Sequence, residues 1–153
     1  MSQAIKHAAS ALNFYFQLEE VPKPSGKILI IQGTPGPWLE YLELSTTDVL
    51  CFLANQNTEW TQKRITPIQE TEESYDVIIH FATKFATENL ATLGKFSQKL
   101  NEGGRWISVC SNRMGASRLK KDVSKLFAEV ETCSKAKCRI MDTTSPVDAP
   151  LAR

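Results

Sequence analysis

Two short, largely apolar runs constrain what this chain can fold into. The runs "ILII" and "DVII", at 28–31 and 76–79, do not alternate between polar and apolar residues. A strand with one face in water alternates, so an unbroken apolar run favours a parallel strand that helices cover on both faces. The sequence therefore predicts a three-layer α/β fold with a mostly parallel sheet. Its strands are expected at 27–32, 48–54, 64–68, 75–81 and 105–110.

Apolar residues at helical spacing predict the helices that cover this sheet. The first helix is expected within 2–20, and the prolines of "VPKPSG" end it because proline lacks an N–H and biases the residue before it away from helix. The second follows Thr87 as its N-cap and ends at the glycines of "NEGG". The third, within 115–130, carries an apolar stripe. Its residues are Leu119, Val123, Leu126 and Phe127.

The carboxy-terminal part of the chain predicts an antiparallel hairpin over 128–142, with its turn near 134–137. A chain of 153 residues, of which 42% are hydrophobic, is long enough for one domain with a substantial core. We expect that single α/β domain at 1–142. The segment 143–153 has two prolines and no periodicity, which indicates a flexible tail or a linker stub.

Charge, hydropathy and cysteine content exclude several classes of protein. A net charge of +1 gives no global field for nucleic acid, so a basic partner surface would have to be local. No apolar run approaches the roughly 20 residues of a membrane helix, and residues 1–20 lack the layout of a secretion signal. A cytoplasmic protein with no membrane partner and with reduced thiols is expected. Alternatively, Cys133 and Cys138 could face each other across the hairpin; no metal site is expected, because further ligands are missing.

The stretch 74–110 contains an aromatic-Asp-apolar strand, a helix, a double-glycine turn and a second apolar strand. The characteristic places are held by Tyr75, Asp76, Gly103 and Gly104. In this pattern the chain resembles class I S-adenosylmethionine-dependent methyltransferases. Residues 10–142 look most like the amino-terminal, non-catalytic domain of bacterial ribosomal RNA guanine-N2 methyltransferases, the small subunit methyltransferase C type. The resemblance implies a Rossmann-like methyltransferase fold with a C-terminal antiparallel hairpin.

In that family two domains of the same fold stand in tandem, and the carboxy-terminal one carries cofactor and catalysis. The resemblance therefore implies a solitary or truncated first domain. Such a domain would bind ribosomal RNA or support a catalytic methyltransferase domain, supplied by a separate chain or by further sequence. Two alternatives stay open: a small active S-adenosylmethionine-dependent methyltransferase with a divergent cofactor loop, and a protein-interaction module.

The turn "QGTPGP" after the first strand stands where that family has its cofactor loop, acid-x-Gly-x-Gly-x-Gly. Gly33 and Gly36 are three residues apart, and this spacing does not fit the loop. With Gly33 as the first glycine, Ile31 takes the place of the acid. Pro35 and Pro37 then replace the other glycines, and neither has an N–H to donate. The pattern favours a structural turn, with Pro37 as the first residue of a short helix, "PWLEYL".

Two further positions would have to serve an active enzyme. The second strand should end in an acid for the ribose hydroxyls of the cofactor, but the sequence offers amides, of which Asn55 is the candidate. After the fourth strand, "HFATKF" replaces the family's Asn-Pro-Pro-aromatic turn, and His80 is the candidate base. A hydrogen-bonded structural histidine is the preferred interpretation. An active protein would hold S-adenosylmethionine with Gly33, Gly36, Asn55 and His80; otherwise no cofactor is expected.

Positive charge gathers in the last third of a chain that is otherwise nearly neutral. Such local clusters are what binding to a phosphate backbone requires. The alternative is an ordinary solvated helix face. Together with the resemblance, the cluster predicts contact with ribosomal RNA. The expected RNA-binding residues are Arg113, Arg118, Lys121, Lys125, Lys137 and Arg139, with Lys120 and Lys135 beside them.

Overall fold

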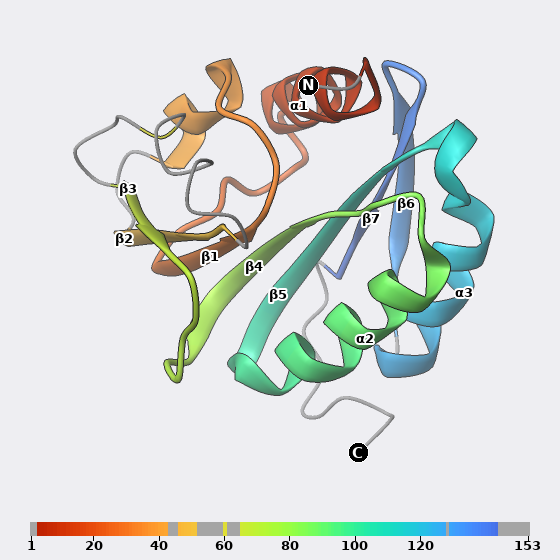
Figure 1. The fold of residues 1–153 in the computed structure, drawn as a ribbon. Coiled ribbons are helices and arrows are strands. Elements are labelled where there is room, and N and C mark those ends of the chain that lie inside the picture. The colour runs from red at the N-terminus through yellow and green to blue at the C-terminus, as the bar shows by residue number, and fades with distance from the viewer. Residues whose placement is uncertain (1–2, 43–45, 52–59, 61–64, 128, 144–153) are drawn as a thin grey trace.

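A computed structural model describes residues 3–42, 46–51, 60, 65–127 and 129–143, and these contain a seven-stranded sheet of order β3-β2-β1-β4-β5-β7-β6. The first five strands are parallel, and β7 runs antiparallel between β5 and β6 (Figure 1). The α/β class, the mostly parallel sheet and the antiparallel pair at the end are confirmed. The strands are β1 (Lys27–Ile31), β2 (Thr46–Leu50), β3 (Ile65–Ile68), β4 (Tyr75–Phe81), β5 (Leu100–Ser111), β6 (Glu131–Lys135) and β7 (Cys138–Asp142).

Helices cover both faces of this sheet (Figure 1). Successive residues of a strand point to opposite faces. In β1, Ile28 and Ile30 therefore face one apolar cluster, and Leu29 and Ile31 face the other. Both faces are dry, which explains why the run has no polar alternation. One face carries α1 (Gln3–Gln17) and the 3-10 helix η1 (Pro37–Leu42); the other carries α2 (Ala86–Phe96) and α3 (Ala116–Leu126).

The expected start of α2 is wrong. The N-cap is Phe85, and Thr87 lies inside the first turn. The segment before the helix is instead fixed from within it. The side-chain oxygen of Asn89 accepts the backbone N–H of Thr83 at 2.9 Å, and its amide donates to the Thr83 carbonyl at 2.8 Å. This side chain fixes the segment that leads into the helix, and the N-cap residue itself makes no side-chain capping bond.

The expected end of α2 is also wrong, because the two glycines of "NEGG" belong to β5. The helix stops at Phe96 and continues into the short 3-10 helix η3 (Ser97–Lys99). Gly104 lies so close to the chain that a Cβ would stand 2.8 Å from the Asn101 carbonyl oxygen. The glycine therefore allows a close backbone approach at the start of a long strand, and does not cap a helix.

The hairpin of β6 and β7 turns at Ala136 and Lys137, whose φ angles are 49° and 62°. Two left-handed residues in succession are the geometry of a two-residue hairpin turn. The register places Cys133 opposite Ile140 and Cys138 opposite Lys135, so the idea that the two cysteines face each other across the strands is wrong. Both are free thiols, and burial raises the pKa of Cys138 to about 11.

The expected tail begins with a residue that is part of the packed structure. Thr143 is buried, and its hydroxyl accepts the backbone N–H of Trp106 at 2.8 Å. The rest of the tail, 144–153, and the part of the expected second strand at 52–54 lie outside the described residues. Within the described ranges, no helix has the length and apolar character to cross a membrane.

A buried ion pair joins the first helix to the sheet. The Arg105 guanidinium on β5 donates to both carboxylate oxygens of Asp142 on β7, at 2.9 and 2.6 Å. The Tyr15 hydroxyl on α1 donates to the same carboxylate at 2.6 Å. Burial and the neighbouring carboxylate raise the pKa of Tyr15 far above its usual range, so the hydroxyl keeps its proton. A third Arg105 donor bonds the Pro22 carbonyl at 2.8 Å. Arg105 and the fully buried Asp142 together therefore join α1 and the segment at Pro22 to the sheet.

We predict that Tyr15→Phe lowers the free energy of unfolding by about 1.5–3 kcal/mol, because it removes a hydrogen bond to a buried charge. Denaturant unfolding measures the change. Tyr41→Phe is the matched control, since Tyr41 also stacks beside Phe16, at 6.0 Å between ring centroids. Equal stability of Tyr15→Phe and the wild type would show that the hydroxyl does not anchor the helix.

Candidate functional site at the carboxyl edge of the sheet

The topology identifies one place in this sheet for a ligand. From β1 the chain order proceeds outward to β2 and β3, and from β4 it proceeds in the opposite direction to β5. In open α/β sheets, ligands bind beyond the carboxyl ends of the strands where the order reverses. Here that place lies between the ends of β1 and β4. The turn with Gly33 and Gly36 and the end of β4, with His80 and Phe81, therefore border the expected crevice.

Gly33 is held against an aromatic ring. Its φ is +95°, and a Cβ at this position would lie 2.5 Å from the ring of Phe81. The backbone conformation and the contact both require glycine. Gly33 therefore brings the turn onto Phe81, the last residue of β4, and the ring covers its Cα.

Three aromatic side chains fill the space around this contact. Trp38, at the start of η1, is fully buried, and its ring centroid lies 5.6 Å from that of Phe81 and 6.5 Å from that of Trp60. Its indole N–H donates to the Thr34 carbonyl at 3.2 Å, which uses one acceptor of the turn. A Cβ on Gly36 would lie 3.2 Å from the Trp38 ring. Both glycines of the turn therefore make room for aromatic packing.

These residues do not fit S-adenosylmethionine. A cradle for that cofactor needs backbone N–H donors that the ligand can approach and an acid near its charged part. Pro35 and Pro37 have no N–H, Ile31 stands where the acid would be, and the ring of Phe81 covers Gly33. Asn55, the candidate for the ribose, lies outside the described residues.

A groove of about 480 Å³ lies between the turn and α1. Phe14, which is 50% exposed, lies on its wall. Its other lining residues are Lys6, Ala9, Ser10, Asn13 and the turn residues 34–37.

His80 lies inside the sheet and takes part in a buried polar cluster. Its Nδ1 lies 2.9 Å from the Ser108 hydroxyl, which also accepts the indole N–H of Trp106 at 2.7 Å. The Ser108 hydroxyl therefore links His80 on β4 to Trp106 on β5. Burial lowers the pKa of His80 to about 4, so the ring is neutral at pH 7. This geometry holds three side chains of β4 and β5 in place.

Asp76, part of the family pattern, lies at the opposite end of β4. Its carboxylate accepts the backbone N–H of Lys27 at 2.8 Å and the side-chain amide of Asn101 at 2.9 Å. The first of these bonds is the main reason that the pKa of Asp76 is lowered. A side chain on Gly26 would collide with this carboxylate. Asp76 therefore ties β1, β4 and β5 together at the amino edge of the sheet.

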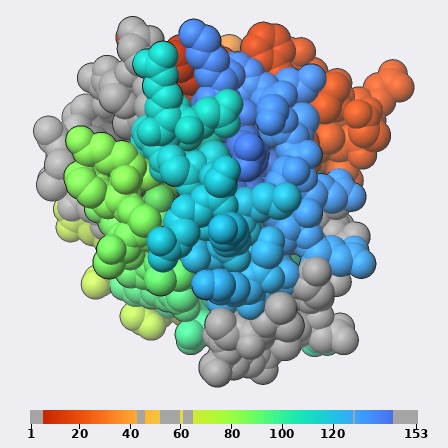
Figure 2. All heavy atoms as spheres, turned by 90° about the vertical axis from the view of Figure 1, so that its right-hand side faces the viewer, coloured from red at the N-terminus to blue at the C-terminus, as the bar shows by residue number. Residues whose placement is uncertain are grey.

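The basic residues lie on the side of the molecule formed by α3 and the hairpin, which faces the viewer in Figure 2. An open hollow of about 580 Å³ is bordered by Lys120, Lys121, Lys125 and Arg139. We call these four residues the α3 basic face. Arg139, on β7, donates to the Ser117 hydroxyl of α3 at 3.4 Å, which positions its guanidinium beside the lysines.

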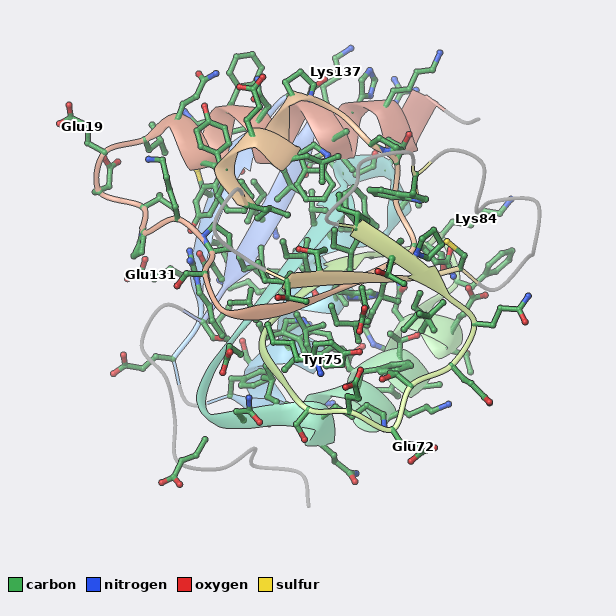
Figure 3. All side chains as sticks on the ribbon, turned by 90° about the vertical axis from the view of Figure 1, so that its left-hand side faces the viewer. Glu19, Glu72, Tyr75, Lys84, Glu131 and Lys137 are labelled. Atoms are coloured by element: carbon green, nitrogen blue, oxygen red, sulfur yellow. The ribbon has the colours of Figure 1, made fainter. Side chains whose placement is uncertain are left out.

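The other expected RNA-binding residues lie around this face. Arg113, in the 3-10 helix η4 (Asn112–Met114), and Arg118 border a second, smaller pocket together with Lys84. Lys137 lies at the turn of the hairpin. In Figure 3, Lys84 and Glu131 lie on opposite sides of the molecule. Lys84 follows the carboxyl end of β4, whereas Glu131 is the first residue of β6.

Two residues of this region are missing from the sequence interpretation. Lys84 joins the pocket only through the sheet topology, which no local pattern encodes. Asp122 gives a signal that could have been found: it is a charged residue next to Val123 on the apolar stripe of α3. It is 2% exposed. Its Oδ2 lies 3.4 Å from Nε of Arg118, and its Oδ1 lies 3.9 Å from Nζ of Lys125.

Comparison with known proteins gives fold relationships. No family model matches the chain, and neither does any curated protein. A similar solved structure is the 16S rRNA methyltransferase RsmC of T. thermophilus, in complex with AdoMet and guanosine, with 13% identity and a TM-score of 0.69 over 95% of this chain and 40% of that chain. The N-methyltransferase NodS of Bradyrhizobium japonicum has 12% identity and a TM-score of 0.64, over 90% of this chain and 95% of that one. An rRNA methylase from Streptococcus thermophilus has 11% identity and a TM-score of 0.59, over 90% and 91%. The chain thus has the Rossmann-like fold of class I methyltransferases.

We predict a pH effect from His80. Its pKa is about 4 in the folded protein and near 6.5 in the unfolded chain, so only the unfolded state gains the proton as the pH falls between these values. The contribution of neutral His80 to the free energy of unfolding is therefore complete above about pH 6.5, and roughly 3 kcal/mol of it is lost by pH 4. Denaturant unfolding at a series of pH values measures this loss, and His80→Asn should reduce it. His7→Asn, at the other histidine, controls for removal of an imidazole; an identical pH dependence in His80→Asn and the wild type would refute the assignment.

Proposed function

We propose that this chain is a methyltransferase-like domain that carries out no methyl transfer itself and contacts ribosomal RNA, alone or beside a catalytic methyltransferase domain. One observation carries the proposal. Phe81 and Trp38 pack against the turn whose backbone a cofactor would have to approach. An active enzyme would have to move Phe81 away from Gly33, and this would break the aromatic cluster of the core.

The RNA part of the proposal is supported by the α3 basic face. Lys120, Lys121 and Lys125 are exposed around one hollow, and Arg139 closes it from β7. Cations that project from one surface into water are suited to phosphate groups, because each contact releases bound counterions from the nucleic acid. Several solved structures of this fold are named as rRNA methyltransferases or methylases, and one holds guanosine.

A partner domain is the other part of the proposal. The chain matches 40% of the T. thermophilus RsmC chain, so that protein holds a further region of comparable size. By this analogy the chain would correspond to the non-catalytic, amino-terminal domain of an enzyme of this kind. Its catalytic counterpart would then supply the cofactor site, and this chain would supply RNA contacts.

We predict that the wild type binds single-stranded ribosomal RNA fragments at low salt, with an affinity that falls steeply as salt is raised. The double variant Lys121→Glu, Lys125→Glu should weaken binding by about tenfold or more and flatten the salt dependence, because two phosphate contacts are lost. Fluorescence anisotropy with a labelled fragment measures both quantities.

The matched control is Lys23→Glu, Lys95→Glu, which makes the same change in net charge at exposed positions outside the α3 basic face. This control should bind RNA nearly as the wild type does. Equal losses in the two double variants would mean that net charge, and not this surface, drives binding. Identical binding by the wild type and the Lys121, Lys125 variant would contradict the proposed RNA surface.

A further inference from the structure

The strand β6 (Glu131–Lys135) forms one border of the sheet, and among the described residues no strand pairs with its outer edge. It belongs to the hairpin on the side of the molecule that faces the viewer in Figure 2. An edge strand presents N–H and C=O groups to which a further strand can add. The strand at the opposite border, β3, contains Pro67, which has no N–H to donate. The two borders therefore differ, and β6 is the one suited to a neighbour.

The hydrogen bonds of β7 identify the backbone groups of β6 that point outward. At the two ends of β7, the Lys137 carbonyl and the Thr143 N–H bond the backbone at the two ends of the paired part of β5, both at 3.0 Å. Backbone groups of successive residues point to opposite sides of a strand, so the odd-numbered residues of β7 bond β5 and the even-numbered ones bond β6. The even-numbered residues are paired with the odd-numbered residues of β6. The N–H and C=O groups of Thr132 and Ser134 therefore point away from the sheet.

The sequence of this strand, "ETCSK", is complementary to itself when it is read in the opposite direction. In an antiparallel pair of two such strands with a two-fold axis at Cys133, Thr132 lies opposite Ser134 of the second copy. The outward groups of these two residues then exchange both N–H···O bonds on each side of the axis. Glu131 lies opposite Lys135 of the second copy, also on each side. The backbone and the charges therefore match in the same arrangement.

The charges select this register over its neighbours. Opposite charges on directly facing residues of an antiparallel pair attract, and like charges there destabilise the pair. The next registers that keep the outward backbone groups together place either Glu131 or Lys135 opposite Cys133. A lysine in an edge strand usually keeps other strands away. Here a glutamate at the mirrored position removes that protection for a second copy of the same strand.

We propose that β6 pairs with β6 of a second copy of this chain about a two-fold axis at Cys133, and that this gives a symmetric dimer with one continuous sheet. A contact of 5 residues per copy is small beside the roughly 20–30 residues a side of a stable interface. The dimer is therefore weak and depends on concentration.

The symmetry has a consequence for the α3 basic face. The axis stands perpendicular to the sheet, and α1 and α3 cover opposite faces of the sheet. Both copies of α3 therefore lie on the same face of the dimer, and their basic residues are offered to one partner. This consequence rests on the RNA contact proposed above, whereas the pairing of the strands does not.

Sedimentation velocity from micromolar to millimolar concentration tests the pairing. The wild type should change from monomer to dimer over this range. Lys135→Glu should weaken dimerisation by about tenfold or more, because it places like charges opposite each other on both sides of the axis. The exchange Glu131→Lys, Lys135→Glu should restore the dimer. Lys95→Glu, on α2, makes the same change in net charge as Lys135→Glu and should dimerise as the wild type does, and thermal melting checks the fold of each variant.

The thiol of Cys133 gives a second, positional measurement. Directly opposite residues that share no backbone hydrogen bonds have Cα atoms about 4.5 Å apart, which is within the range that a disulfide spans. Mild oxidation of concentrated protein should therefore link two copies through Cys133, as mapped by mass spectrometry. The other cysteines of the chain are buried. Cys133→Ser should lose the link and still dimerise in sedimentation.

A wild type that stays monomeric up to millimolar concentration overturns the inference. Equal dimerisation of Lys135→Glu and the wild type also overturns it, as does a folded exchange variant that remains monomeric. A link through a different cysteine places the contact elsewhere and refutes the β6 pairing. These outcomes leave the proposed function in place if RNA binding still depends on Lys121 and Lys125, and loss of that dependence refutes the RNA surface without affecting the dimer.

Discussion

The ring of Phe81 lies on the backbone of Gly33, and this contact decides what the carboxyl edge of the sheet can do. It fixes the turn after β1 in a conformation that only glycine adopts readily. It also brings Trp38 into the core, where the indole donates to Thr34. The rings of Phe81 and Trp38 therefore pack against the turn that borders the crevice which the strand order creates. The proposal of a domain without its own methyl transfer follows from this packing.

Other buried polar groups of the sheet have structural roles. The buried polar groups of His80 and Asp142 are paired with neighbouring side chains and hold the sheet and α1 in place. Asp122 differs from them, because one of its oxygens lacks a donor within the described ranges. It lies next to the cations Arg118 and Lys125, so this carboxylate oxygen and the positive side chains occur on the same helix. The exposed cations of this helix are the physical basis for assigning RNA contact to the α3 side.

Much of the fold could be predicted from local patterns, because burial on both faces leaves unbroken apolar runs and helix burial leaves stripes. The run at 28–31 and the stripe of α3 are both confirmed. The ends of α2 could not be predicted, because Asn89 acts across a turn and Gly104 serves a backbone contact between strands. For the site, the sequence indicates a structural turn at Gly33 and Gly36. It does not indicate that Phe81 is the ring that covers the first glycine, because this depends on how β1 and β4 pair.

The most direct test of this account is calorimetric titration of the protein with S-adenosylmethionine up to millimolar concentration. A turn that Phe81 and Trp38 cover predicts no saturable heat, in the wild type or with the demethylated product as ligand. Saturable binding with a stoichiometry of one would mean that the rings leave the turn for the cofactor, and it would contradict the central claim.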